Sequence, residues 1–355
     1  MEVVKLLSAL LLVSFLPPGF SRVVNKFSDI PECESFFMDK MTPNIPGILV
    51  DGIVKDQNRY KPICQMFKNV YRFATIYDTT SRIPVFSAYT FTGSAGSIKR
   101  PAWKIEPQLD KQEGEPNMEL AIPGVIYNNQ AVKEDYVGSE VTKKVNRGHM
   151  FPNEFAIDQD TKNSTFTMTN CVPQAETSNA FSWCRMESKV KKIIEDNCKD
   201  PNKKAYLVTG AVPGDDILNN RVNIPSYLWS AYCCYNSNQQ QWMAKGYWSK
   251  NEQEVCGKKR LLPKTLKDLY KDLEPFYPSA EVKVSLFSQQ CPVDFTLKVA
   301  GEDEEDEDFY ETEVSGEDEE CPCPPQSPFM TWAWVKSQIS KVIEEVYLNF
   351  IKIFL

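Results

Sequence analysis

The chain has 355 residues, of which 42% are hydrophobic and 12% aromatic, which excludes an intrinsically disordered protein and allows one large core or two ordinary ones. Its formal net charge of −8 is unevenly distributed, because residues 302–320 contain 13 acidic and no basic side chains. The rest of the chain has 40 basic and 35 acidic residues (48 minus 13), a surplus of +5 that is compatible with a polyanionic substrate but does not require one.

The N-terminus predicts a secretory signal peptide over residues 1–21. Lys5 precedes an apolar run from Leu6 to Leu16, which is too short to span a bilayer and is followed by Pro17, Pro18 and small residues. Eleven cysteines fit an oxidising compartment, and their odd number leaves one unpaired or bonded to another chain. Asn163 begins the only N-glycosylation sequon, so we expect a secreted, disulfide-bonded glycoprotein with this asparagine at its surface.

Between residues 33 and 300 the pattern predicts one mixed α+β domain. Alternating apolar residues with many β-branched and aromatic side chains predict strands over residues 70–77, 83–91, 205–209, 227–235 and 241–248. Apolar residues at three- and four-residue spacing predict helices over residues 179–196 and 263–273. The strands outnumber the helices, which favours a sheet core flanked by helices.

Two segments follow this domain. The acidic run within residues 301–328 predicts a solvated, disordered linker, with competition against nucleic acid for a basic groove as the alternative. Residues 329–355 place apolar side chains at helical spacing among charged ones, which predicts an amphipathic helix. The charges argue against a transmembrane span, and contact with a membrane surface or with a protein partner fits this helix equally well.

The single histidine, His149, stands in the run Val145-Asn146-Arg147-Gly148-His149. Imidazole can accept a proton at neutral pH, which aspartate, lysine and tyrosine cannot do without large pKa shifts. Basic and amide neighbours suit work on a phosphate. A lone histidine is more often a hydrogen-bonded structural residue, so its neighbours in the chain have to decide between the two readings.

Thirty residues further along, Asn179 opens the predicted helix of residues 179–196, with Glu187 and Lys191 behind it. At 3.6 residues per turn these side chains fall within roughly a third of the helix circumference. An amide oxygen and a carboxylate suit a hard cation such as Mg²⁺, which takes one or two protein oxygens and keeps several waters. The alternative is an ordinary helix N-terminus with a solvated pair of charges.

Taken together, these motifs resemble the DNA/RNA non-specific endonuclease family, whose signature is Asp-Arg-Gly-His. The resemblance covers most of the domain and is carried by an ordered set: Arg100 to Lys104, Pro107, Asp135 to Gly138, Arg147 to His149, Asn170 to Gln174, Asn179, Trp183, Glu187, Val208 to Gly210 and Ile224 to Trp229. It implies the ββα-metal (His-Me finger) fold with a mixed, largely antiparallel sheet. The signal peptide, the cysteines and Tyr232 to Tyr235 resemble the secreted vertebrate members of that family.

The resemblance also implies roles. His149 is the general base that deprotonates water, and Asn179 binds one Mg²⁺, with Mn²⁺ as a substitute, to stabilise the leaving 3′ oxygen. Glu187 orients water of the metal's shell, and Asn170 supports the site by hydrogen bonds. Arg100 and Arg147 contact the phosphate of DNA or RNA, and Lys191 stands where the family often has another basic residue.

One position departs from the family pattern. The signature aspartate is Asn146 here, which can form a hydrogen bond but brings no negative charge to the metal's surroundings. The sequence therefore leaves two functions open. One is a secreted, Mg²⁺-dependent, non-specific endonuclease. The alternative is a catalytically weakened protein of the same fold that binds nucleic acid or other polyanions.

Overall fold

A six-stranded antiparallel sheet forms the centre of the molecule. The computed structural model describes residues 22–91, 93–94 and 100–296. The strand order is β12-β11-β8-β5-β4-β3, and all neighbours run antiparallel. The strands are β3 (Tyr60–Phe67), β4 (Val70–Asp78), β5 (Ile83–Phe91), β8 (Ala205–Val212), β11 (Tyr227–Asn236) and β12 (Gln241–Lys250).

Five of these strands lie where the alternating pattern predicts them, so the α+β prediction is confirmed. The sixth, β3, was not predicted, because Pro62 and buried polar Gln65 interrupt its pattern. A proline lacks the N–H that a central strand needs, and β3 tolerates Pro62 at the edge of the sheet. Within the core, Gln65 Nε2 donates to the hydroxyls of Thr75 and Thr169.

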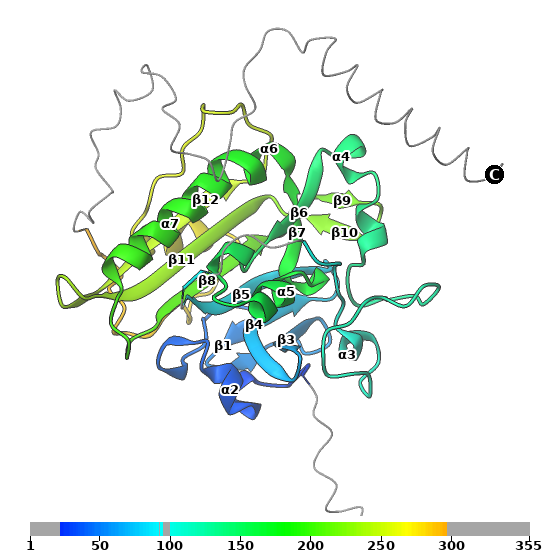
Figure 1. The fold of residues 1–355 in the computed structure, drawn as a ribbon, viewed down its shortest axis with the longest axis horizontal. Helices are drawn as coiled ribbons and strands as arrows, with labels where there is room; N and C mark the ends of the chain where they lie inside the picture. Colours follow the sequence, from blue (N-terminus) through cyan, green and yellow to red (C-terminus); the bar gives the residue numbers. More distant parts are fainter. Residues whose placement is uncertain (1–21, 92, 95–99, 297–355) are drawn as a thin grey trace, which may run out of the picture. The chain divides into compact units, whose positions relative to one another are not determined.

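Helices and loops cover both faces of the sheet (Figure 1). Helix α7 (Cys184–Asn197) lies on one face, next to β11. Its buried Met186, Val190 and Ile193 belong to a core that also contains side chains of β8, β11 and β12. On the other face, α8 (Leu266–Leu273) packs three buried leucines into a second core that also includes the N-terminal segment. Helix α8 begins later than predicted because Thr265 caps it, accepting from the Asp268 N–H, while Lys264 forms an isolated antiparallel bridge with Gly246.

A second, smaller structural unit is a hairpin followed by a helix. Strand β6 (Val145–His149) pairs antiparallel with β7 (Cys171–Ala175), and α6 (Glu176–Ser178) follows directly. A π turn, η6 (Asn179–Trp183), joins α6 to α7, so the helix predicted over residues 179–196 begins earlier and is not regular. This β–β–α order agrees with the ββα arrangement that the motifs imply.

The remaining elements are short. They are η1 (Phe27–Asp29), α2 (Pro31–Glu34), η2 (Met38–Lys40), β1 (Leu49–Val50), β2 (Ile53–Val54), α3 (Pro107–Asp110), η3 (Lys133–Tyr136), α4 (Ser139–Thr142), η4 (Asn153–Phe155), α5 (Gln159–Thr165), η5 (Met168–Asn170), β9 (Asp216–Leu218) and β10 (Val222–Ile224). Pairs β1–β2 and β9–β10 form separate two-stranded sheets.

Disulfides tie the peripheral segments to the central sheet. Cys33–Cys64 joins the N-terminal segment to β3, Cys198–Cys234 joins the end of α7 to β11, and Cys233–Cys291 joins β11 to the segment after α8. Cys184 and Cys256 are also disulfide-bonded. Cys171 is free and buried, which agrees with the expectation of an unpaired cysteine. Such cross-links stabilise mainly by restricting the unfolded chain.

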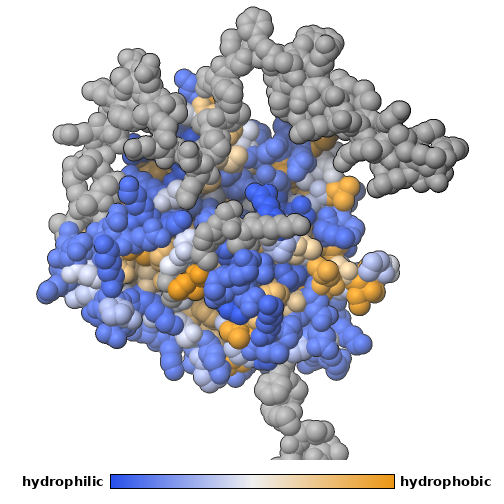
Figure 2. All heavy atoms as spheres, viewed as in Figure 1, coloured by the Kyte–Doolittle hydropathy of each residue, from blue (hydrophilic) through white to orange (hydrophobic). Residues whose placement is uncertain are grey.

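Several predicted segments lie outside the described residues: the signal peptide at 1–21, the linker at 301–328 and the amphipathic helix at 329–355. In the part of the chain that is described, no helix has the length and apolar character needed to cross a membrane. Figure 2 shows a mostly hydrophilic face with scattered apolar side chains. Exposed apolar residues include Leu120, Ile122, Val125 and Ile126, which lie in one loop that the core does not cover.

Candidate functional site

The hairpin places the signature residues on two faces. Because side chains alternate along a strand, Arg147 and His149 share one face of β6, and Asn146 and Gly148 share the other. Gly148 lies opposite Val172, and Asn146 lies opposite Gln174. The order of the signature therefore separates the basic and imidazole groups from the amide.

Gly148 is required because of the side chain of Gln174. A Cβ at position 148 would lie 1.9 Å from Gln174 Oε1 and 2.7 Å from Gln174 Cβ. The collision with Cβ cannot be relieved by rotating the glutamine.

We therefore expect Gly148→Ala to destabilise the protein by about 1–3 kcal/mol through overpacking. Urea unfolding measures the change. Adding Gln174→Gly should recover most of the loss, with Gln174→Gly alone as the control. If the double variant is no more stable than Gly148→Ala, the collision is not the cause.

His149 lies between two aromatic rings. Its ring centroid is 4.9 Å from that of Trp103 and 4.7 Å from that of Phe166. Burial, and then the positive charges of Arg100 and Arg147, lower the pKa of His149 to about 3. Its Nε2 atom is buried and has no hydrogen-bond partner. The imidazole is therefore neutral at physiological pH, with a ring nitrogen available for a proton.

The two arginines of the site differ in how they are held. The Arg147 guanidinium lies over the rings of Trp103 and Tyr136, with its carbon 5.2 Å and 5.9 Å from the two centroids. Such stacking fixes the plane of the guanidinium and leaves its N–H edge for an anion. Arg100 is exposed, and its charge reaches His149. The structure thus gathers Arg100, Arg147 and His149.

Asn170 is fully buried at the end of η5, next to the residues that follow His149. Its Oδ1 accepts from the Phe151 N–H and from Ser87 Oγ, both at 2.9 Å. Its Nδ2 donates to the carbonyls of Phe151 and Thr165. The buried Asn170 side chain therefore links the central sheet to the turn after His149 through hydrogen bonds.

Asn179 meets the hairpin through Asn146. Asn179 Nδ2 donates to Asn146 Oδ1 at 2.8 Å, and both side chains are half-buried. This bond fixes the orientation of the Asn179 amide, because an amide has its donor and its acceptor on opposite sides. Asn179 Oδ1 is thereby directed away from Asn146.

Glu187 lies on α7, where its Oε1 accepts a 2.8 Å hydrogen bond from Trp183 Nε1. Burial, and then the negative charge of Glu154, raise the pKa of Glu187 to about 8, against the opposing effect of the Trp183 bond. A nearby cation would favour the charged carboxylate. Lys191 is half-buried one turn further along the same helix.

The side chains near Asn179 fit Mg²⁺, which keeps several water ligands, better than they fit an ion whose ligands all come from the protein. Over the described ranges, no group of three or more histidine, cysteine, aspartate or glutamate side chains is placed to hold a metal. Asn179 Oδ1 is one hard oxygen that Mg²⁺ would accept, since this ion typically takes one or two oxygens from the protein and the rest from water and phosphate. Buried polar atoms of His149, Gln174 and Ser178 have no hydrogen-bond partner, which is uncommon in folded proteins.

The sequon asparagine, Asn163, lies in α5, where it is half-buried and accepts from Gln159 Nε2 through Oδ1. Its backbone carbonyl accepts from Lys104 Nζ at 2.7 Å. The side chain is thus partly open to solvent, and glycosylation stays a prediction.

Sequence reasoning missed a segment that holds the helix in place. After β12, Asn251 Oδ1 accepts from the Ala175 N–H, and Gln253 Oε1 accepts from Thr177 Oγ1. Glu254 accepts from both Ser182 N and Ser182 Oγ. These residues lie more than seventy positions after their partners, and no motif or spacing in the sequence could have indicated the pairing.

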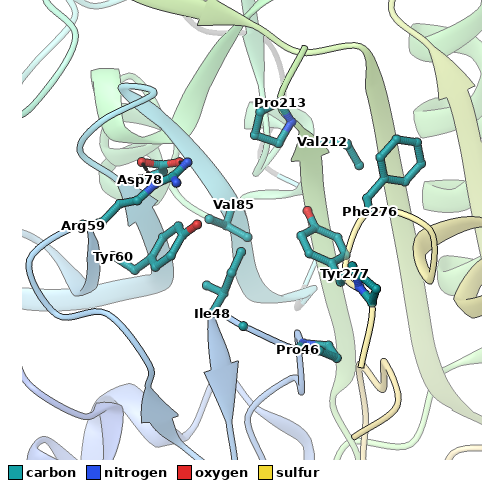
Figure 3. Close-up of a pocket in the computed structure, with 12 residues that line it drawn as sticks. Pro46, Ile48, Arg59, Tyr60, Asp78, Val85, Val212, Pro213, Phe276 and Tyr277 are labelled. Carbon is teal, nitrogen blue, oxygen red and sulfur yellow. Dashed lines mark hydrogen bonds and ion pairs between the residues drawn. The ribbon is translucent and has the colours of Figure 1, made fainter. Parts of the chain in front are cut away.

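A cavity of about 430 Å³ lies apart from this site (Figure 3). Val85, Val212 and Tyr277, which belong to the α8-side core, line it together with the ion pair of Arg59 and Asp78. None of the predicted site residues lines the cavity. The candidate chemistry is thus on the α7 side, away from this hollow.

The comparisons with known proteins agree with the motifs. The family described as DNA/RNA non-specific endonuclease matches residues 57–294. Endonuclease domain-containing 1 protein is 31% identical over 213 residues in Homo sapiens, covering 57% of this chain and 39% of that protein. In Mus musculus it is 29% identical over 211 residues, covering 57% and 38%. The match therefore spans about two-fifths of the length of these relatives.

Two further proteins resemble this chain at lower sequence identity. A Serratia marcescens protein named Nuclease is 26% identical over 166 residues, covering 45% of this chain and 55% of that protein. A chain in the crystal structure of the EndoG/EndoGI complex is 14% identical, with a TM-score of 0.42, covering 60% of this chain and 84% of that one.

Proposed function

Because this chain belongs to the DNA/RNA non-specific endonuclease family, we propose that it hydrolyses phosphodiester bonds at the site formed by β6, β7 and the helix after them. The observation that carries the proposal is the neutral His149, with an unpartnered Nε2, beside two arginine charges. A base and cations side by side suit attack by water on a phosphodiester.

The side chains divide the work as follows. Arg100 and Arg147 bind the phosphate, and the stacked guanidinium of Arg147 sets its orientation. His149 takes a proton from the attacking water at its free ring nitrogen. Asn179 would hold Mg²⁺, or Mn²⁺ in its place, with Glu187 orienting water beside it and Lys191 adding positive charge. When bound, the ion would neutralise charge that develops on phosphate and on the leaving 3′ oxygen.

Secretion is part of the proposal. Three described disulfides and the predicted signal peptide support an oxidising, extracellular location. The substrate would then be DNA or RNA outside cells.

The proposal is tested by incubating the purified mature protein with plasmid DNA and with RNA, in Mg²⁺ or in chelator. We expect cleavage in Mg²⁺ and none in chelator. Absence of cleavage of both substrates under all conditions would contradict it.

A second function is supported by Asn146, whose neutral amide replaces the family's carboxylate beside Asn179. Without that negative charge the protein would bind nucleic acid or another polyanion with little turnover. Such binding should weaken steeply with salt, because phosphate contacts release counterions. Binding that does not change between low and high ionic strength would contradict this alternative.

Asn146→Asp separates the two functions. The new carboxylate can still accept from Asn179 Nδ2, and its charge favours a nearby cation, so we expect Mg²⁺ affinity and kcat to rise by roughly 10-fold or more. Mg²⁺ titrations of the cleavage rate measure both. Asn146→Ala, which only removes the bond, is the matched control and should be slower than wild type. Cleavage that appears only with Asn146→Asp favours the binding function, and a slower Asn146→Asp variant contradicts this account of Asn146.

A further inference from the structure

The helix that carries Asn179 and Glu187 is not regular, and a carboxylate from another part of the chain coincides with the irregularity. In an α-helix the Ser182 N–H would donate to the carbonyl of Ser178, four residues earlier. In this chain the Ser182 N–H donates to Glu254 Oε1 at 2.7 Å, and Ser182 Oγ donates to Glu254 Oε2 at 2.8 Å. The π turn spans Asn179–Trp183 and so includes Ser182.

A side chain that enters the hydrogen-bond ladder of a helix is a known cause of such local widening. The Glu254 side chain is only 4% exposed, so it is a built-in part of the structure and not a surface contact. Lys259 Nζ lies 3.7 Å from its Oε2 and offsets its charge. The backbone at Glu254 is fixed as well, because its N–H donates to Thr177 Oγ1 at 2.7 Å.

The π turn changes which side chains share a face. Each residue turns an α-helix by about 100°, so the eight residues from Asn179 to Glu187 would leave them about 80° apart. A π turn acts as one extra residue in the helix and removes about 100° of that rotation. Asn179 and Glu187 therefore come to within roughly 20° of each other.

We propose that Glu254 is a positioning residue, which forces the π turn and thereby aligns Asn179 and Glu187 on one face of the helix. The role of this alignment in cleavage and metal binding rests on the proposed nuclease function. The dependence of the π turn on Glu254 does not rest on that function.

The test compares four variants of the full mature chain. Glu254→Ala removes both bonds, whereas Glu254→Gln keeps an acceptor for the Ser182 N–H. Ser182→Ala is the matched control, because it removes only the hydroxyl bond and keeps the backbone one. Deleting the exposed Ala180 in the Glu254→Ala background places Asn179 and Glu187 seven residues apart, which in a regular α-helix again leaves them about 20° apart.

We expect Glu254→Ala to lower kcat by 10- to 100-fold and to raise the Mn²⁺ dissociation constant, measured by electron paramagnetic resonance, by the same factor. The KM for nucleic acid should change little, because Arg100 and Arg147 are untouched. Glu254→Gln and Ser182→Ala should stay within about threefold of wild type, and the deletion should restore most of the loss. Circular dichroism and thermal melting confirm that each variant is folded.

A crystal structure of Glu254→Ala decides the inference independently of activity. Retention of the π turn over residues 179–183 would overturn it, as would wild-type kcat and Mn²⁺ affinity in a folded Glu254→Ala protein. If the wild type neither cleaves nor binds Mn²⁺ but Glu254→Ala loses the π turn, the failure falls on the proposed function, and the positioning of the two side chains by Glu254 stands.

Discussion

Replacing His149 with alanine is expected to lower the rate of phosphodiester cleavage by about 10²- to 10⁴-fold, the usual contribution of a general base. No second histidine exists in the chain to take over its task. Plasmid and RNA cleavage in Mg²⁺ measures the loss, and thermal melting checks that the packing against Trp103 and Phe166 survives. Added imidazole should restore part of the rate by entering the space left by the side chain. Cleavage by His149→Ala at the wild-type rate would exclude His149 as the base.

The single histidine also makes its pKa directly measurable. The imidazole proton resonance can be assigned without ambiguity, and its titration should show a pKa of about 3. Because the charges of Arg100 and Arg147 contribute to this low value, a bound phosphodiester analogue that neutralises them should raise it. A base that strengthens when the phosphate is in place suits the proposed reaction. A free-protein pKa near 6.5 would show that His149 is not in this environment.

The central sheet could be predicted from the sequence because its strands alternate plainly, but the edges of the fold could not. Strand β3 breaks the alternation with Pro62, which only its edge position allows. The start of α8 depends on whether Lys264 pairs with Gly246, a contact between segments eighteen residues apart. The position of β3 and the start of α8 depend on tertiary contacts, which cannot be inferred from the local sequence pattern.

The candidate site was predicted in part for the same reason. Arg147, His149 and Asn179 carry recognisable chemistry in a recognisable order, and the family that this order indicated is confirmed, while the roles of the three residues stay predictions. The irregular helix was not predicted, because the spacing of apolar residues over 179–196 is that of one regular α-helix. What changes its geometry is Glu254, whose relation to Ser182 exists only in the folded chain. Gln174, which excludes any side chain at position 148, was part of a motif but had no assigned role.

Asn179→Ala is expected to have the second large effect, since it removes the one protein oxygen proposed to hold Mg²⁺. Loss of residues that only support a metal ligand commonly costs 10- to 100-fold in affinity or activity, so loss of the ligand should cost at least about 100-fold. The variant also leaves Asn146 Oδ1 without its donor, which makes the Asn146 variants a necessary reference. Mn²⁺ affinity and the Mg²⁺ dependence of kcat measure the change.

Asn179→Asp is the informative counterpart. A carboxylate at position 179 keeps an oxygen for the cation but can no longer donate to Asn146, so the bond that sets the orientation of the ligand is lost. Metal affinity should then fall less than in Asn179→Ala. Combining Asn179→Asp with Asn146→Asp would place two carboxylates next to each other. Their mutual repulsion should lower activity below that of Asn179→Asp alone, except at Mg²⁺ concentrations that keep the cation bound. Equal Mn²⁺ affinity in wild type and Asn179→Ala would exclude Asn179 as the ligand and direct attention to Glu187.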